Sequence, residues 1–74
     1  MEGKMQKNLL EAKMKEHGDL GETLAQALDM TPTTLSRKKN GIADFTQSEI
    51  MRMKIRYGLS ADDVERIFFT DELS

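Results

Sequence analysis

The sequence predicts an all-α domain of five short helices. Strand signals are weak, because β-branched residues are sparse and alternation of apolar and polar residues does not persist. Three segments instead share one helix-start pattern, in which a Ser or Thr that can cap a helix follows an apolar residue. With 74 residues and no cysteine, the chain is expected to form a single domain, residues 1–74, held together by packing alone.

The first helix is expected at about residues 6–17, and the second helix follows closely. Leu10 and Met14 lie one turn apart in the first helix, which Gly18 can end because glycine adopts left-handed backbone readily. Asp19 can cap the second helix, with Glu22 three residues later as its reciprocal partner. The second helix has a narrow apolar stripe formed by Leu24, Ala25 and Leu28.

The starts of the other three helices are explicit in the sequence. Thr31 precedes a proline, which suits the first helical position because no N–H is needed there. Thr46 with Glu49, and Ser60 with Asp63, have the spacing of capping boxes. An apolar residue before each cap can meet another inside the helix, in the pairs Met30 and Leu35, Phe45 and Ile50, and Leu59 and Val64.

The last two helices carry most of the larger apolar residues. The fourth, about residues 47–57, has one stripe of Ile50, Met53 and Tyr57 and a second of Met51 and Ile55, which predicts the central element of the core. The fifth, about residues 61–69, offers Val64, Ile67 and Phe68 to that core. Phe69 lies off this stripe and Leu73 follows one turn later, so both are candidates for a dimer surface, unless Phe69 folds back on its own domain. The ordered core should span about residues 5–69, followed by an acidic tail, residues 70–74.

The net charge of −2 hides an uneven distribution along the chain. Residues 31–56 carry six Lys or Arg against two acids, a balance of +4, whereas residues 57–74 carry one Arg against five acids, a balance of −4. A basic middle segment suits a polyanionic partner, although a run of charge is more often only a solvated face.

The third helix, between Met30 and Asn40, has little to bury. Leu35, backed by Met30, is its one large apolar side chain. Its other side chains are Thr33, Thr34, Ser36, Arg37, Lys38 and Lys39. Because only Asp29 and Met30 separate it from the second helix, the two helices must cross steeply, and Ala25 is small enough to lie at the crossing. One face of the third helix is then held against the domain and the opposite face projects from it.

The segment ETLAQALDMTPTTLSRKKNG, residues 22–41, resembles the helix-turn-helix of phage repressor and Cro-like regulators, the bacterial group often called XRE-type. The matching positions are Leu24, Ala25, Leu28, Met30, Leu35, Asn40 and Gly41. The resemblance covers about residues 5–69, because a lambda-repressor-like domain of five helices carries this motif in its second and third helices. It implies double-stranded operator DNA as the partner and a homodimer, at least on DNA.

The resemblance also implies roles for the residues of the third helix. It places Thr33, Thr34 and Arg37 at base edges, and Thr31, Ser36, Lys38, Lys39 and Asn40 at the DNA backbone. The chemistry agrees, because threonine can contact base edges or thymine methyls and arginine can donate two hydrogen bonds to guanine. Lysine and asparagine suit phosphates. Pro32 stands where relatives often have a base-reading side chain, and it has no hydrogen bond to donate.

Four residues depart from the family pattern. Gly21 stands where a glutamine commonly contacts a phosphate, and Leu20 replaces the usual hydroxyl cap. Asp29 replaces the usual turn glycine; aspartate tolerates left-handed backbone, but it brings negative charge toward the DNA. Lys38 occupies a position that is usually apolar, which predicts a looser hold of the third helix on the core.

No catalytic pattern is evident, so we expect no enzyme, metal, cofactor or small-molecule substrate. The chain has one histidine and no cysteine, and it lacks a glycine-rich phosphate loop. His17, in a last helical turn, and Asp62 and Asp63, in a first turn, are explained by the helix dipole. The sequence shows neither a signal peptide nor the ~20 apolar residues that span a bilayer, so a cytoplasmic protein with no membrane partner is expected.

The expected function is therefore that of a sequence-specific DNA-binding transcription regulator of the phage or prophage repressor type, reading the major groove with its third helix. The alternative is a protein-interaction module on the same fold, such as an antirepressor or antitoxin-like partner with weak or no DNA affinity. The acidic net charge, Gly21 and Asp29 support the alternative. The cations clustered on the third helix favour DNA binding.

Overall fold

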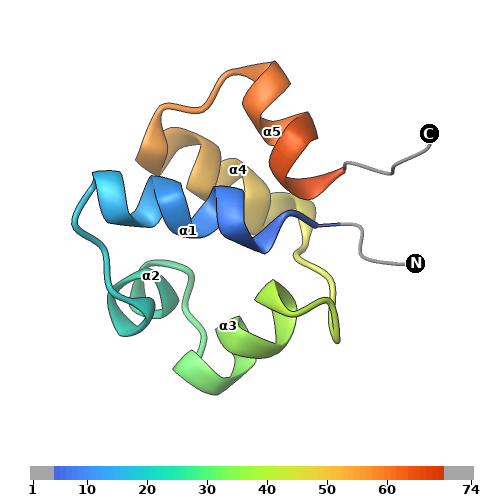
Figure 1. The fold of residues 1–74 in the computed structure, drawn as a ribbon. Coiled ribbons are helices and arrows are strands. Elements are labelled where there is room, and N and C mark those ends of the chain that lie inside the picture. The colour runs from blue at the N-terminus through green and yellow to red at the C-terminus, as the bar shows by residue number, and fades with distance from the viewer. Residues whose placement is uncertain (1–4, 70–74) are drawn as a thin grey trace.

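The computed structural model describes residues 5–69, and all regular secondary structure in that range is helical. The helices are α1 (Lys7–Glu16), α2 (Gly21–Ala27), α3 (Pro32–Lys39), α4 (Gln47–Tyr57) and α5 (Ala61–Phe68) (Figure 1). α1 and α4 cross the middle of the domain, with α5 on one side and α2 and α3 on the other (Figure 1). The predicted all-α class and the five helices are confirmed over residues 5–69.

Local hydrogen bonds set the starts of α4 and α5. Thr46 Oγ1 accepts from the Glu49 N–H at 3.1 Å, and Glu49 Oε1 accepts from the Thr46 N–H at 2.9 Å. Ser60 and Asp63 make the same reciprocal pair at 3.0 and 3.2 Å. Both predicted capping boxes are thus formed, and each satisfies donors that the first helical turn leaves unpaired.

The start of α2 differs from the prediction, because Asp19 does not cap it. The N-cap is Leu20, which makes no side-chain cap hydrogen bond. The Asp19 carboxylate instead accepts from Arg56 Nε at 2.7 Å, from Arg56 Nη2 at 2.8 Å and from the Tyr57 hydroxyl at 2.6 Å. The hydrogen bond from Arg56 is the main cause that lowers the pKa of Asp19 to about 2. This cluster ties the loop between α1 and α2 to the end of α4.

α1 to α4 each end near a residue with a positive φ angle, and at the end of α2 this residue is Asp29 rather than glycine. Its φ angle is 59°. The N–H of Met30 donates to the Ala25 carbonyl at 2.9 Å, and the N–H of Asp29 donates to the Gln26 carbonyl at 3.1 Å. These bonds satisfy carbonyls that the helix leaves unpaired. The left-handed geometry expected of Asp29 is therefore present.

One hydrophobic core joins the helices. Its largest fully buried side chains are Leu10, Leu24, Leu35 and Met53, one from each of the first four helices. The other buried apolar residues are Met14, Ala25, Leu28, Tyr57, Leu59, Ile67 and Phe68, and Met5, Met30, Phe45, Ile50 and Val64 pack against them. Phe45, before α4, meets the ring of Phe68 edge to face at 5.6 Å between centroids.

Only one of the two apolar stripes of α4 is buried, so α4 is not enclosed on both apolar sides as the prediction of a central core element implies. Met53 and Tyr57 are buried, whereas Met51 and Ile55 are 55% and 76% exposed. The second stripe faces solvent in the described domain. Phe69, just after α5, is also 56% exposed. We call the surface formed by Met51, Ile55 and Phe69 the α4–α5 patch.

Candidate nucleic-acid interface

α3 is held to the domain along one side. It packs against α2, from which it is separated by residues 28–31. Leu35 is buried in the core, and Ala25 of α2 is buried in the same cluster. Thr31 Oγ1 accepts from the Thr34 N–H at 3.2 Å, which confirms the predicted start of α3.

The exposed face of α3 carries polar side chains at helical spacing. Thr33, Ser36 and Arg37 are exposed, and so is Asn40 at the end of the helix. Residues three and four apart lie on the same face of a helix, so these four form one stripe opposite Leu35. Among residues 5–69, no side-chain hydrogen bond or ion pair is formed by the Arg37 guanidinium, which leaves it available to a ligand.

Thr34 is placed differently from the other candidate base-reading residues. Its side chain is half-buried, and its hydroxyl accepts from the Thr31 hydroxyl at 3.0 Å. Thr31 and Thr34 are thus bonded to each other at the start of α3. Ser36, which the sequence analysis assigned to the DNA backbone, shares the exposed face with Thr33 and Arg37 instead.

Lys38 points toward α4 and fastens α3 to the domain. Its ammonium nitrogen lies 2.6 Å from Glu49 Oε1, the oxygen that also accepts from the Thr46 N–H, and 5.9 Å from the centre of the Phe45 ring. The two charged side chains are only 13% and 17% exposed. Burial alone would raise the pKa of Glu49, but the hydrogen bonds from Lys38 and Thr46 outweigh it and lower that pKa. The prediction that Lys38 loosens the hold on α3 is therefore wrong.

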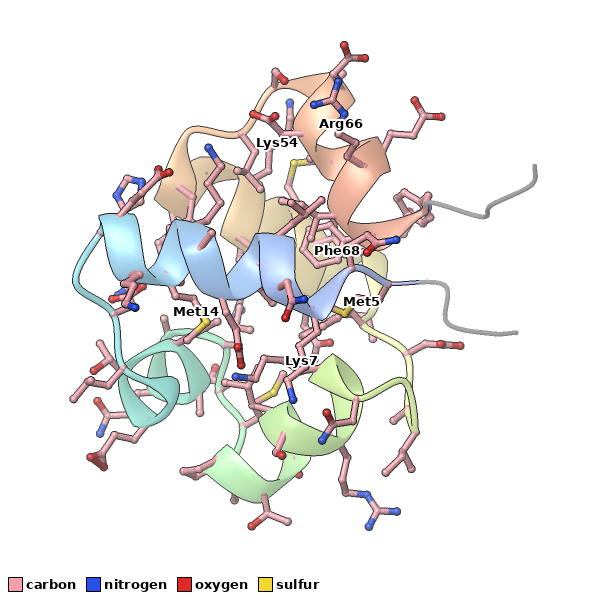
Figure 2. All side chains as sticks on the ribbon, viewed as in Figure 1. Met5, Lys7, Met14, Lys54, Arg66 and Phe68 are labelled. Atoms are coloured by element: carbon pink, nitrogen blue, oxygen red, sulfur yellow. The ribbon has the colours of Figure 1, made fainter. Side chains whose placement is uncertain are left out.

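Lys39 and Asn40 are paired with α1. Lys39 Nζ lies 3.0 Å from Glu11 Oε2, and Lys7 Nζ donates to Asn40 Oδ1 at 2.9 Å. Figure 2 shows Lys7 reaching from α1 toward the C-terminal end of α3. Lys7 is a basic residue of this surface that the sequence did not predict. A partial signal was present, because Lys7 and Glu11 are one helical turn apart on α1.

Residues at the two ends of α2 affect the charge and shape of the surface beside α3. Gly21 has open space around it, since a Cβ added there would meet no atom within 4 Å. The Asp29 carboxylate lies 3.8 Å from Arg52 Nη1 at an exposed position. Solvent screens such a pair strongly, so Arg52 offsets the negative charge of Asp29 only in part.

The structure also bears on the remaining predicted residues. Phe69 is exposed, and Leu73 lies outside the described residues. Within residues 5–69, the longest apolar stretches of helix fall short of what is needed to cross a membrane. Comparison of the chain with protein-family models, with curated proteins and with solved structures gives no match.

Proposed function

We propose that the protein is a DNA-binding transcription regulator that inserts α3 into the major groove, with α2 and α3 acting as a helix-turn-helix. The observation that carries the proposal is the exposed stripe of Thr33, Ser36 and Arg37 on a helix whose opposite side is anchored by Leu35. The buried side fixes the orientation of α3, and the exposed side carries hydrogen-bonding groups at the spacing of one helix face.

The chemistry of this stripe suits base edges. An arginine without a partner among residues 5–69 can donate two hydrogen bonds to guanine, and hydroxyl side chains can donate or accept at several bases. Thr33 and Arg37 are the proposed base readers, and Ser36 joins them because it shares their face. Lys38 does not take part, because Glu49 holds it against α4. Such a regulator would act in the cytoplasm of a bacterial cell.

A single copy of α3 is too short to read a whole operator. Its eight residues rise about 12 Å, roughly three to four base pairs of B-DNA. Regulators of this design bind as dimers whose half-sites lie about one helical turn apart. The proposal therefore includes a homodimer.

The α4–α5 patch is the proposed dimer surface. It borders a hollow of about 410 Å³ between the two helices, lined by the apolar residues Ile50, Met51, Ala61, Val64 and Phe69. Lys54 lines the hollow from α4 and Glu65 lines it from α5. A twofold axis would place the α4 wall of one copy against the α5 wall of the other, so that the apolar residues of the two hollows meet. Such a dimer would cover the exposed apolar side chains of both copies.

Fluorescence anisotropy with a labelled duplex of mixed sequence, at several salt concentrations, tests DNA binding. We expect binding at low salt that weakens as salt rises, because phosphate contacts release counterions. Arg37→Ala should weaken it, whereas Lys13→Ala, which removes the same charge from the side of α1 near Asp63 of α5, should change it little. Absence of binding at low salt, or equal effects of the two substitutions, would refute the proposal.

The second candidate function is a protein-interaction module with little DNA affinity. It is favoured by the pairing of Lys38 and Lys39 with carboxylates, which leaves α3 less basic than its sequence suggests. The exposed α4–α5 patch would then serve a different protein. The anisotropy experiment separates the two functions, because this alternative predicts no salt-dependent binding to duplex DNA.

A further inference from the structure

Four polar residues meet where the beginning of α1 faces the end of α3. α1 contributes Lys7 and Glu11, and α3 contributes Lys39 together with Asn40 at its C-cap. Two contacts join the helices: Lys39 Nζ to Glu11 Oε2 at 3.0 Å, and Lys7 Nζ to Asn40 Oδ1 at 2.9 Å. We call these residues the α1–α3 cluster; it contains two ammonium groups and one carboxylate.

The Glu11 carboxylate lies in the field of both lysines. The hydrogen bond from Lys39 is the largest cause of the lowered pKa of Glu11, and the charge of Lys7 acts in the same direction. The Glu11 side chain is 44% exposed, whereas that of Lys39 is 13% exposed. The Glu11 carboxylate is thus bonded to Lys39 and also affected by the charge of Lys7, in a place that solvent and ligands can reach.

This arrangement lies beside the proposed DNA-reading face. Asn40 belongs to both, because it continues the stripe of Thr33, Ser36 and Arg37 and also accepts from Lys7. When the stripe enters the major groove, the groove walls are the phosphate backbones, and the end of α3 meets one of them. A phosphate there would have Lys7, Lys39 and the Asn40 amide as partners, which are donors that suit it.

We propose that the α1–α3 cluster is a phosphate-binding site for the nucleic-acid backbone, and that in the free protein the Glu11 carboxylate occupies the place of the phosphate. The inference rests on the proposed function and adds a regulatory element to it. Binding exchanges one anion for another at Lys39, so this lysine adds little net affinity while Glu11 is present. Glu11 therefore weakens binding to any duplex.

The substitution Glu11→Gln tests this site. Glutamine keeps the shape of the side chain and its helix propensity but removes the charge, so the fold should be retained, which circular dichroism checks. Each bound copy gains one phosphate contact, which steepens the slope of log affinity against log salt by about 0.9 per copy. Duplex binding should become tighter, and a fourfold rise in salt should cost about 3.5-fold more affinity per bound copy than it costs the wild type.

Glu16→Gln is the matched control. It removes the same charge from the same helix, but Glu16 pairs with Lys13 at 3.7 Å and takes no part in the cluster. Glu16→Gln should leave the slope of log affinity against log salt (the salt slope) unchanged. In the Glu11→Gln protein, adding Lys39→Met should remove the gain in duplex affinity. Lys39→Met alone should change the affinity little. The two effects are non-additive in this way only if the two residues share one site.

The outcomes separate this inference from the proposed function. A steeper slope for Glu11→Gln alone supports the phosphate site. Equal slopes and affinities for wild type, Glu11→Gln and Glu16→Gln, with clear duplex binding by all three, would overturn the site and leave DNA binding intact. Absence of binding by wild type and by Glu11→Gln at low salt would overturn both.

Discussion

Replacing Lys38 by methionine should destabilise the domain without altering its phosphate contacts with DNA. Methionine retains most of the apolar stem of lysine but removes the ammonium that bonds to Glu49 at 2.6 Å. The Glu49 side chain, which is 17% exposed in the pair, would then remain largely buried without its charged partner. The α3 helix would lose its polar connection to α4.

The magnitude follows from the burial of the pair. Hydrogen bonds to charged groups contribute about 1.5–3 kcal/mol when shielded, and exposed ion pairs contribute about 0–1 kcal/mol. At 13% and 17% exposure the Lys38–Glu49 pair lies between these limits, so the free energy of unfolding should fall by about 1–2 kcal/mol. For a domain of this size the thermal midpoint should fall by roughly 5–15 °C.

Lys39→Met is the matched control for stability. Its partner Glu11 is 44% exposed, so the loss should stay below about 1 kcal/mol. Thermal unfolding followed by circular dichroism compares the two variants under one condition. The reasoning is refuted if Lys38→Met is no more destabilising than Lys39→Met, or if Lys38→Met lowers the salt slope of DNA binding by the amount of a phosphate contact.

Three other substitutions test the ends of α2 and the loop before it. Asp29→Gly should raise the free energy of unfolding by about 0.5–1 kcal/mol in a denaturant titration, because the left-handed backbone at φ 59° costs an L-residue about 1–2 kcal/mol and glycine loses only about 0.5–1 kcal/mol more chain entropy on folding. Gly21→Gln should tighten duplex binding more than Gly21→Ala does in anisotropy titrations, because space is open at Gly21 and the family resemblance implies a phosphate contact there. The stability of the wild type should decline as the pH falls from about 4 toward 2, because the pKa of Asp19 is about 2 in the folded chain against 3.8 ordinarily. Asp19→Asn should lower stability at neutral pH and reduce this decline.

Each of these has an outcome that would contradict it. A loss of stability in Asp29→Gly would mean that the aspartate side chain makes a contact worth more than the backbone cost. Equal DNA affinity for Gly21→Gln and Gly21→Ala would exclude a phosphate contact by the glutamine. Acid unfolding curves of the same shape for wild type and Asp19→Asn would mean that the folded state does not lower the pKa of Asp19.

The dimer surface is tested by sedimentation. Phe69→Ser should reduce self-association without unfolding the domain, because Phe69 is 56% exposed and lines the hollow between α4 and α5. Ile42→Ser is a matched control, since Ile42 is an exposed apolar residue in the loop between α3 and α4, away from that hollow. Wild-type protein that stays monomeric at high concentration would contradict the proposed surface.

Much of the fold could be predicted because its signals are local. A cap and its partner three residues later predicted the starts of α4 and α5 correctly. The same spacing failed at Asp19, because Arg56 and Tyr57 of α4 engage its carboxylate. The α4 prediction failed because periodicity identifies an apolar stripe but not what covers it. Ile55 has the same pattern as a core residue, yet no helix of the described domain packs over it.

The charged contacts were the least predictable part of the candidate site. The partners of Lys38, Lys39 and Lys7 lie 11, 28 and 33 residues away in the chain. Sequence spacing therefore did not predict these partners, and the resemblance assigned all three cations of α3 to DNA. The structure separates them, with Arg37 exposed, Lys38 turned to α4 and Lys39 turned to α1.

Selection of bound duplexes from a random pool tests the central claim, that the exposed face of α3 reads DNA sequence. The wild type should enrich duplexes with two related half-sites about one helical turn apart. Arg37→Ala should still enrich duplexes, but with the preference relaxed at one guanine in each half-site. Enrichment of no motif by the wild type, or of the same motif by both proteins, would contradict the claim.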